Sequence, residues 1–174
     1  MDILFKDLAK LEFKPWDHRE FLEYMASVGL TVPWEVALQF YFDHRDKEEF
    51  VSQYGHLDLR RLEWRTEDWS AEVLLQVSMY SPFVRWTDVV ARKAKNLGIE
   101  GFSAMDSRSE VVAHWENQGT WRVPPILIDG TLVRPPSSGP RLVEGHTRIG
   151  CLRGLVGIGA LPPESMHKVF FGRY

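Results

Sequence analysis

A glycine turn between an expected strand and an expected helix constrains the fold of this chain most. Arg141 to Val143 predict the end of a short buried strand. Gly145 then predicts a turn. The apolar residues from Ile149 to Val156 recur at helical spacing, so they predict a helix that starts directly after the turn.

The same turn carries three polar side chains, His146, Thr147 and Arg148. The start of a helix has unpaired N–H groups and the positive end of the helix dipole, so it attracts anions. An imidazole and a guanidinium at that position add donors that fit phosphate. The alternative is an ordinary strand-to-helix turn with a capping threonine and a solvated arginine.

Composition favours an ordinary domain in the cytoplasm. The chain has 174 residues, of which 44% are hydrophobic, enough for a real core. It has no apolar run of about 18 residues and no basic segment followed by a long apolar stretch, so we expect neither a membrane span nor a secretory signal. Cys151 is the only cysteine, which excludes an internal disulfide framework.

Charge gives no general reason to expect nucleic-acid binding, because the net charge is −3. The acidic residues gather near the N-terminus, where residues 1–56 hold 6 Lys and Arg against 11 Asp and Glu. This part of the chain is therefore a candidate to meet a basic partner.

The caps and apolar spacing of residues 1–56 predict three helices. Asp17 is a candidate cap for a helix whose apolar residues recur as far as Leu30. Thr31 is a candidate cap for the second helix, with Pro33 tolerated in its first turn. A short third helix is expected over Lys47–Tyr54, before Gly55.

Residues 57–119 predict a strand and then helices. Leu57–Arg65 alternates in part, which indicates a strand. Ser70 is a candidate cap for the next helix, although the apolar run Val73–Val77 leaves a strand as the alternative. Two more helices are expected, over Trp86–Leu97 before Gly98, and from Asp106 or Ser107 to Gly119.

The last third of the chain gives the clearest pattern. Pro124-Pro125 leads into Ile126–Ile128, which predicts a short buried strand, and Asp129-Gly130 predicts a turn. A proline- and glycine-rich loop over residues 134–140 precedes the glycine turn, and a last strand is expected over His167–Phe171.

The segments Pro125-Ile-Leu-Ile-Asp129 and Leu142-Val-Glu-Gly-His-Thr-Arg148, in this order of elements, resemble the core of the ParB and sulfiredoxin superfamily. The resemblance covers about residues 104–174. It implies an α+β fold, a small mixed sheet with packed helices. We accordingly expect a helical N-terminal block at 1–56, packed on a ParB/sulfiredoxin-like core at 57–174.

The resemblance also implies a nucleotide site. The superfamily includes DNA-partition proteins that bind cytidine triphosphate, sulfiredoxins that use adenosine triphosphate, and free-serine kinases, and this turn contacts phosphates in all of them. Here Gly145 would let the backbone approach a nucleoside triphosphate or diphosphate. The side chains expected around the phosphates are Glu144, His146, Thr147, Arg148 and Asp129.

Asp129 has two interpretations. As a carboxylate at the end of a buried strand, it could hold Mg²⁺ beside the phosphates, since hard cations favour carboxylate oxygen. The alternative is a simple turn residue. No pair of histidines has the spacing of metal ligands, so no structural metal site is expected.

Departures from the superfamily narrow the expected activity. Sulfiredoxins carry their catalytic cysteine in this turn, where the present chain has Gly145, so a sulfinic-acid reductase is not expected. The sequence stops just after the last core strand, so direct DNA binding through a following helix-turn-helix region is not expected. The kinases use a carboxylate from the earlier half, and nothing identifies one among Glu63, Glu67 and Asp68 as the base.

Ser165 and Lys168 have the spacing of a serine-lysine pair, but a strand is expected at this position, so we interpret the spacing as a coincidence.

Three functions remain open. The first is a stand-alone bacterial nucleotide-binding protein, with phosphoryl transfer or hydrolysis as the reaction class if it is an enzyme. The second is a non-catalytic interaction protein, such as an immunity protein or antitoxin, whose acidic helical surface binds a basic, toxin-like partner. The third is a phage or plasmid accessory protein with a degenerate core.

Overall fold

The computed structural model describes residues 2–14 and 17–174, and its fold is mixed α+β, as expected. The chain forms two compact units. The first comprises Met1–Arg65, Ile126–Glu144 and Phe170–Tyr174, and the second comprises Thr66–Pro125 and Gly145–Val169. The expected domain boundary between residues 56 and 57 stays a prediction.

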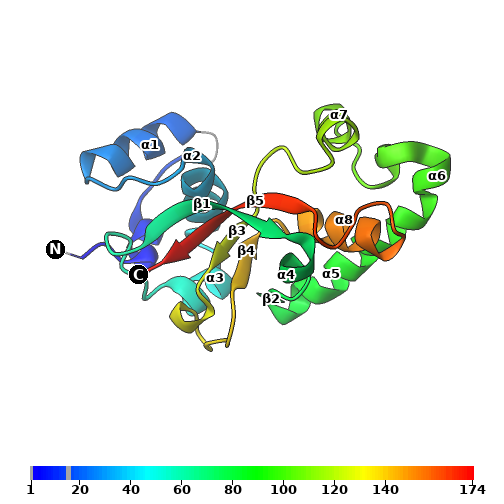
Figure 1. Cartoon of the computed structure of the whole chain (residues 1–174). Coiled ribbons are helices and arrows are strands. Elements are labelled where there is room, and N and C mark those ends of the chain that lie inside the picture. The colour runs from blue at the N-terminus through cyan, green and yellow to red at the C-terminus, as the bar shows by residue number, and fades with distance from the viewer. Residues whose placement is uncertain (1, 15–16) are drawn as a thin grey trace. The chain divides into compact units, whose positions relative to one another are not determined.

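Most helical elements of the first unit come from its N-terminal segment (Figure 1). They are η1 (Phe5–Lys10), α1 (His18–Ser27), α2 (Trp34–Val36), the π-helical turn η2 (Ala37–Phe42) and α3 (Glu48–Tyr54). The expected cap of α1 is confirmed, because Asp17 Oδ1 accepts a hydrogen bond of 3.1 Å from the backbone N–H of Glu20.

The expected start of the second helix at Thr31 is wrong, and α2 begins at Trp34. The physical reason is Pro33, whose ring disfavours helical backbone at Val32 and so keeps the chain extended before the proline. The third helix is confirmed over Glu48–Tyr54, one residue shorter than expected.

The strands of the described chain are β1 (Glu63–Ser70), β2 (Ser78–Met79), β3 (Ile126–Ile128), β4 (Arg141–Glu144) and β5 (Met166–Arg173), and they form one mixed sheet (Figure 1). In the first unit the strand order is β1-β5-β3-β4. Leu127 of β3 pairs with Leu142 of the antiparallel β4 and with Phe171 of the parallel β5. The predicted strands β3, β4 and β5 are therefore confirmed.

An aromatic cluster joins the N-terminal helices to the sheet within the first unit. The ring centroids of Phe5 and Phe40 stack 4.9 Å apart, and Trp64 Nε1 donates a hydrogen bond of 2.9 Å to the Tyr41 hydroxyl. Ile126 belongs to the same buried core. The helical segment therefore shares one core with the strands.

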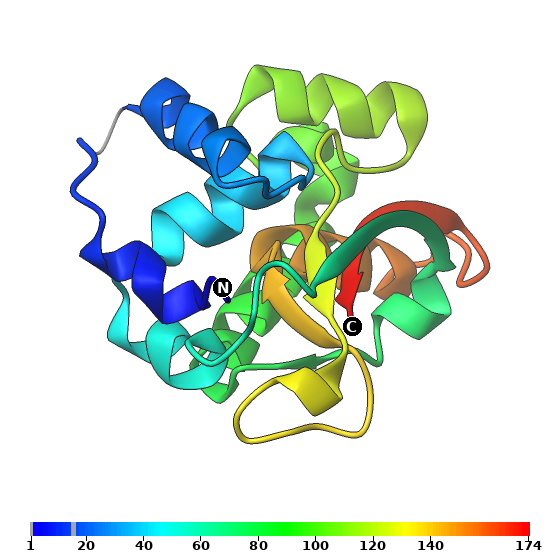
Figure 2. The same cartoon turned by 90° about the vertical axis from the view of Figure 1, so that its left-hand side faces the viewer.

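A long loop connects β3 to β4 and is drawn in yellow in Figure 2. Its first residues form the 3₁₀ turn η5 (Gly130–Leu132), which Asp129 caps by accepting a hydrogen bond from Thr131. The predicted turn at Asp129-Gly130 is confirmed.

The second unit is mainly helical, with α5 lying beside α8 (Figure 1). Its helical elements are α4 (Ala71–Leu74), α5 (Ser81–Arg92), η3 (Lys93–Asn96), α6 (Leu97–Glu100), η4 (Gly101–Ala104), α7 (Ser109–Gln118) and α8 (His146–Gly157). Gly119 has φ +63° and ends α7, as the sequence predicts.

Four expectations for residues 57–98 need correction. The strand expected over Leu57–Arg65 begins only at Glu63 and continues to Ser70. Ser70 does cap a helix, with its Oγ accepting a hydrogen bond of 3.4 Å from Val73 N–H, so the alternative strand over Val73–Val77 is wrong.

The helix expected from Trp86 starts at Ser81, because Pro82 suits a first turn, where a missing N–H costs nothing. Gly98 does not stop a helix. It lies inside α6, and the positive φ falls at Gly101. Within residues 2–14 and 17–174, no helix combines the length and apolar character needed to cross a membrane.

Candidate functional site

The glycine that starts α8 is required by its surroundings. Gly145 has φ +105° and ψ 22°, in the left-handed region that favours glycine. A Cβ on this residue would lie 2.5 Å from the Cβ of Pro125, far inside normal contact distance. The expected glycine turn is confirmed, and it takes the chain from β4 into α8 within one residue.

His146, Thr147 and Arg148 form the first turn of α8, which begins three residues earlier than the apolar spacing predicts. Ile149 N–H donates to the Gly145 carbonyl at 3.0 Å, the first hydrogen bond of the helix. The three polar residues therefore lie at the positive end of a helix of 12 residues.

Two aromatic side chains of α5 border this turn. The ring centroid of Phe83 lies 4.3 Å from that of His146, and Trp86 Nε1 donates a hydrogen bond of 3.1 Å to Thr147 Oγ1. The Trp86 side chain is 48% exposed. An aromatic surface that solvent reaches therefore lies next to the polar first turn of α8.

Arg148 holds the segment that precedes β3. Its Nη1 donates hydrogen bonds to the carbonyl oxygens of Val123 at 3.0 Å and Pro124 at 2.8 Å. The guanidinium carbon also lies 3.6 Å from the position that a Cβ of residue 145 would take. The sequence could not indicate these partners, because any residue supplies a backbone carbonyl.

The structure gathers four of the six expected site residues in the second unit, from Gly145 to Arg148. The other two, Glu144 and Asp129, belong to the first unit. Glu144 ends β4, opposite Ile126. Asp129 Oδ1 accepts hydrogen bonds from the Thr131 N–H at 2.9 Å and from its hydroxyl at 2.8 Å. This capping agrees with the interpretation of Asp129 as a turn residue, and its role towards Mg²⁺ stays a prediction.

The three carboxylates considered as a catalytic base each have a partner. Glu63 Oε2 lies 3.3 Å from Arg65 Nη2, and Glu67 Oε2 accepts a hydrogen bond of 2.8 Å from the Trp69 ring N–H. Asp68 Oδ2 lies 3.2 Å from Lys168 Nζ. These contacts single out none of the three as a base.

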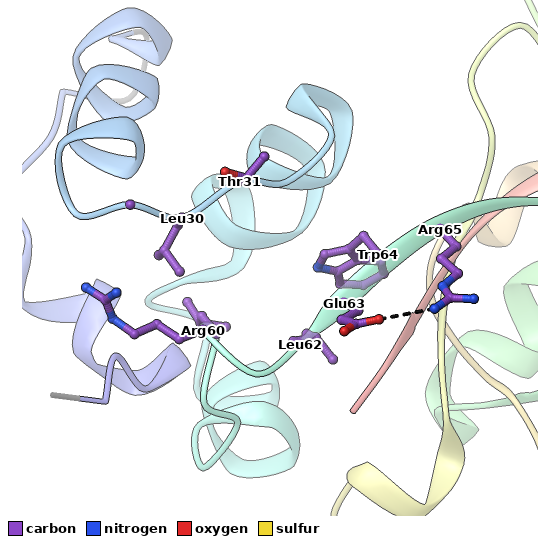
Figure 3. Close-up of a pocket in the computed structure, with 9 residues that line it drawn as sticks. Leu30, Thr31, Arg60, Leu62, Glu63, Trp64 and Arg65 are labelled. Carbon is purple, nitrogen blue, oxygen red and sulfur yellow. Dashed lines mark hydrogen bonds and ion pairs between the residues drawn. The ribbon is translucent and has the colours of Figure 1, made fainter.

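The first unit contains a cavity that the sequence analysis did not find (Figure 3). Its volume is about 440 Å³, and the polar side chains of Arg60, Glu63 and Arg65 line it together with Trp64. Arg60 Nη2 donates a hydrogen bond of 2.7 Å to the Val28 carbonyl, so the guanidinium is held in place. An adjoining cavity of about 350 Å³ is more apolar.

Cys151 is buried on α8, and burial raises the pKa of its thiol to about 12. A thiol of this kind is a poor nucleophile near neutral pH. Among the residues that the structure describes, no three His, Cys, Asp or Glu side chains come together as metal ligands.

Comparison with known proteins found no family model that matches the chain, and no curated protein or solved structure that matches it.

Proposed function

We propose that the chain binds the phosphate groups of a nucleoside triphosphate or diphosphate at the first turn of α8. The observation that carries this proposal is the start of the helix. Gly145, in a conformation that favours glycine, opens a helix of 12 residues whose first three side chains are His146, Thr147 and Arg148. The sequence resemblance to the ParB and sulfiredoxin superfamily also implies that this turn contacts phosphates.

The first turn offers several kinds of donor to an anion. Backbone N–H groups at a helix start point along the axis towards the ligand, and the helix dipole favours negative charge there. The Arg148 guanidinium, held by Val123 and Pro124, lies against Gly145 and adds a fixed positive charge. Fixing this side chain before binding lowers the entropy cost of ordering it around a phosphate.

Phosphoryl transfer or hydrolysis is the reaction class that such a site serves, because positioning and charge neutralisation do most of the work. In this proposal Mg²⁺ accompanies the phosphates, because a hard cation favours their oxygen atoms.

A nucleotide panel tests the proposal. The purified chain is heated with each nucleoside triphosphate or diphosphate, with and without Mg²⁺, and its unfolding temperature is recorded. Binding to the folded state raises this temperature by mass action. We expect a rise with at least one nucleotide, and we expect His146→Ala/Arg148→Ala to abolish it.

Arg153→Ala is the matched control, because Arg153 lies on the same helix but pairs with Asp88 at 2.7 Å, away from the first turn. This variant is expected to keep the rise. The absence of a rise with every nucleotide in the unsubstituted chain contradicts the proposal, and so does a rise that His146→Ala/Arg148→Ala retains.

A second candidate function is a non-catalytic interaction protein with a basic partner. The observation in its favour is that three acidic residues close together in the sequence of the first unit, Asp43, Asp46 and Glu48, are exposed. Charge of one sign on a surface speeds and selects the encounter with a partner of the opposite sign. Pull-down with the intact chain and with Asp43→Lys/Asp46→Lys/Glu48→Lys tests this candidate. A partner retained equally by both proteins contradicts it.

A further inference from the structure

Ser165 and His167 lie on one side of the chain where β5 begins. Residues two apart in extended backbone share a face, whereas their neighbours point the other way. His167 is 2% exposed, whereas Met166 and Lys168 are exposed. Lys168 pairs with Asp68, so the partner of Ser165 is the histidine and not the lysine that the sequence spacing suggests.

The His167 ring lies between two hydroxyl groups of the second unit. Its Nε2 is 2.9 Å from Ser165 Oγ, and its Nδ1 is 2.9 Å from Thr120 Oγ1. A neutral imidazole has one N–H and one acceptor nitrogen. When Nδ1–H donates to Thr120, the lone pair of Nε2 faces the Ser165 hydroxyl.

The surroundings hold this arrangement in place. The Trp121 ring packs against His167 with centroids 5.0 Å apart, and Trp121 Nε1 donates a hydrogen bond of 2.7 Å to the Lys168 carbonyl. Ser165 is fixed through its backbone, because its carbonyl accepts a hydrogen bond of 2.8 Å from Ala71 N–H. Little reorganisation is therefore needed before a proton moves between Ser165 and His167.

The Ser165 and His167 side chains also differ in how far they are exposed to solvent. Ser165 is only partly buried, whereas His167 is buried. Burial lowers the pKa of His167 below its usual value of 6.5, which keeps the ring neutral and able to take a proton near neutral pH.

We propose that Ser165 is a base-activated nucleophile that accepts an acyl group from an activated ester, with His167 as the base and Thr120 as the residue that positions the ring. Ser165 Oγ attacks the ester carbonyl carbon while its proton passes to His167 Nε2. The bond to the ester oxygen then breaks, and the leaving alcohol takes the proton from His167. The products are an ester on Ser165 and a free alcohol. This reaction does not depend on the proposed phosphate site.

The test uses the full chain and p-nitrophenyl acetate. Peptide mass spectrometry locates the acetyl group, and absorbance follows the release of p-nitrophenolate. We expect acetylation of Ser165 in the unsubstituted chain and in the control Ser109→Ala, whose serine is exposed at the start of α7. Ser165→Ala is expected to lose this acetylation. His167→Gln is expected to slow it by about 100-fold or more, the usual contribution of a general base.

Two substitutions of Thr120 distinguish a role in positioning the His167 ring from a role in packing alone. Thr120→Ser keeps the hydroxyl that receives Nδ1–H, so it is expected to retain the acetylation rate, whereas the nearly isosteric Thr120→Val is expected to lose most of it. Thermal unfolding shows which variants are folded in the assay. If His167→Gln is unfolded, the comparison of Thr120→Ser with Thr120→Val tests the role of the histidine in its place. An unmodified Ser165 in the unsubstituted chain overturns the proposal. Equal rates in Thr120→Ser and Thr120→Val overturn it as well.

Discussion

Two separate constraints require glycine at position 145, one from the backbone conformation and one from the lack of space for a side chain. Its φ of +105° is costly for any residue with a Cβ, and the Pro125 ring occupies the place where that Cβ would stand. The sequence could predict the first constraint from the position of glycine between a strand and a helix. It could not predict the second, because the contact joins residues 20 positions apart in the chain.

Gly145→Ala is therefore expected to destabilise the protein by about 1–3 kcal/mol, from backbone strain and overpacking together. Urea unfolding measures the change. Gly139→Ala is the matched control, because a Cβ there meets nothing within 4 Å and its φ is not positive. A loss for Gly145→Ala no larger than that for Gly139→Ala would refute this account.

His44 is the residue whose charge state should affect stability most directly in the first unit. Its ring stacks on Phe50 with centroids 3.8 Å apart, and its Nδ1 is buried with no hydrogen-bond partner in the described structure. Burial lowers the pKa of His44 from 6.5 to about 4. The fold therefore favours the neutral ring.

As the pH falls below about 6.5, the unfolded chain takes up this proton before the folded chain does, so acid favours unfolding until the pH reaches about 4. His44→Phe keeps an aromatic ring on Phe50 and removes the titration. Between pH 7 and pH 4 the unsubstituted chain should lose about 1–2 kcal/mol more than the variant, after allowance for solvent screening. Parallel curves of unfolding free energy against pH would show that His44 has no such role.

At the scale of elements, α8 packs on α5 through small residues on one face. A Cβ on Gly150 would lie 2.8 Å from the Val90 Cβ, and a Cβ on Gly154 would lie 2.5 Å from the Ala91 carbonyl oxygen. These glycines are four residues apart, so they lie on the same side of the helix. The two helix backbones approach closely because neither position carries a side chain.

Gly154→Ala should therefore destabilise the protein by about 1–2 kcal/mol, because overpacking outweighs the better helix propensity of alanine. Gly157→Ala, in the same helix, meets nothing within 4 Å and should be neutral or slightly stabilising. Thermal unfolding of the two variants compares them directly. A stabilising Gly154→Ala would show that the helices separate at little cost.

The strands show what sequence patterns can and cannot predict. Ile126–Ile128 is a fully buried strand, and its apolar run between Pro125 and Asp129 predicts it correctly. Leu57 and Leu59 are buried as well, but in a loop that packs into the core of the first unit, so their alternation reflects burial rather than a strand. β1 lies at the edge of the sheet and none of its residues is buried, so charged residues replace the apolar alternation that would have predicted it.

At the scale of the molecule, each unit is assembled from separate stretches of sequence. The chain passes from one unit to the other after Arg65, Pro125, Glu144 and Val169. Composition and local spacing carry no signal for such a division, because the stretches that make up one unit are separated in the sequence by stretches of the other. This is why the sequence could predict most helices and strands but not how the first unit is built.

The shared core of the first unit leads to a prediction about a shortened chain. Phe5, Phe40 and Tyr41 belong to the same core as Ile126 and Phe170, so residues 57–174 alone lack the aromatic side chains that cover their own strands. Exposed apolar surface of this kind leaves a compact but loosely packed state.

We expect the fragment 57–174 to bind a hydrophobic dye and to lose the near-ultraviolet circular dichroism of the intact chain. Co-expression with residues 1–56 should restore both properties, because the core then regains its aromatic side chains. A fragment 57–174 that unfolds cooperatively on its own, without dye binding, would instead mean that the strands find sufficient cover within that part of the chain.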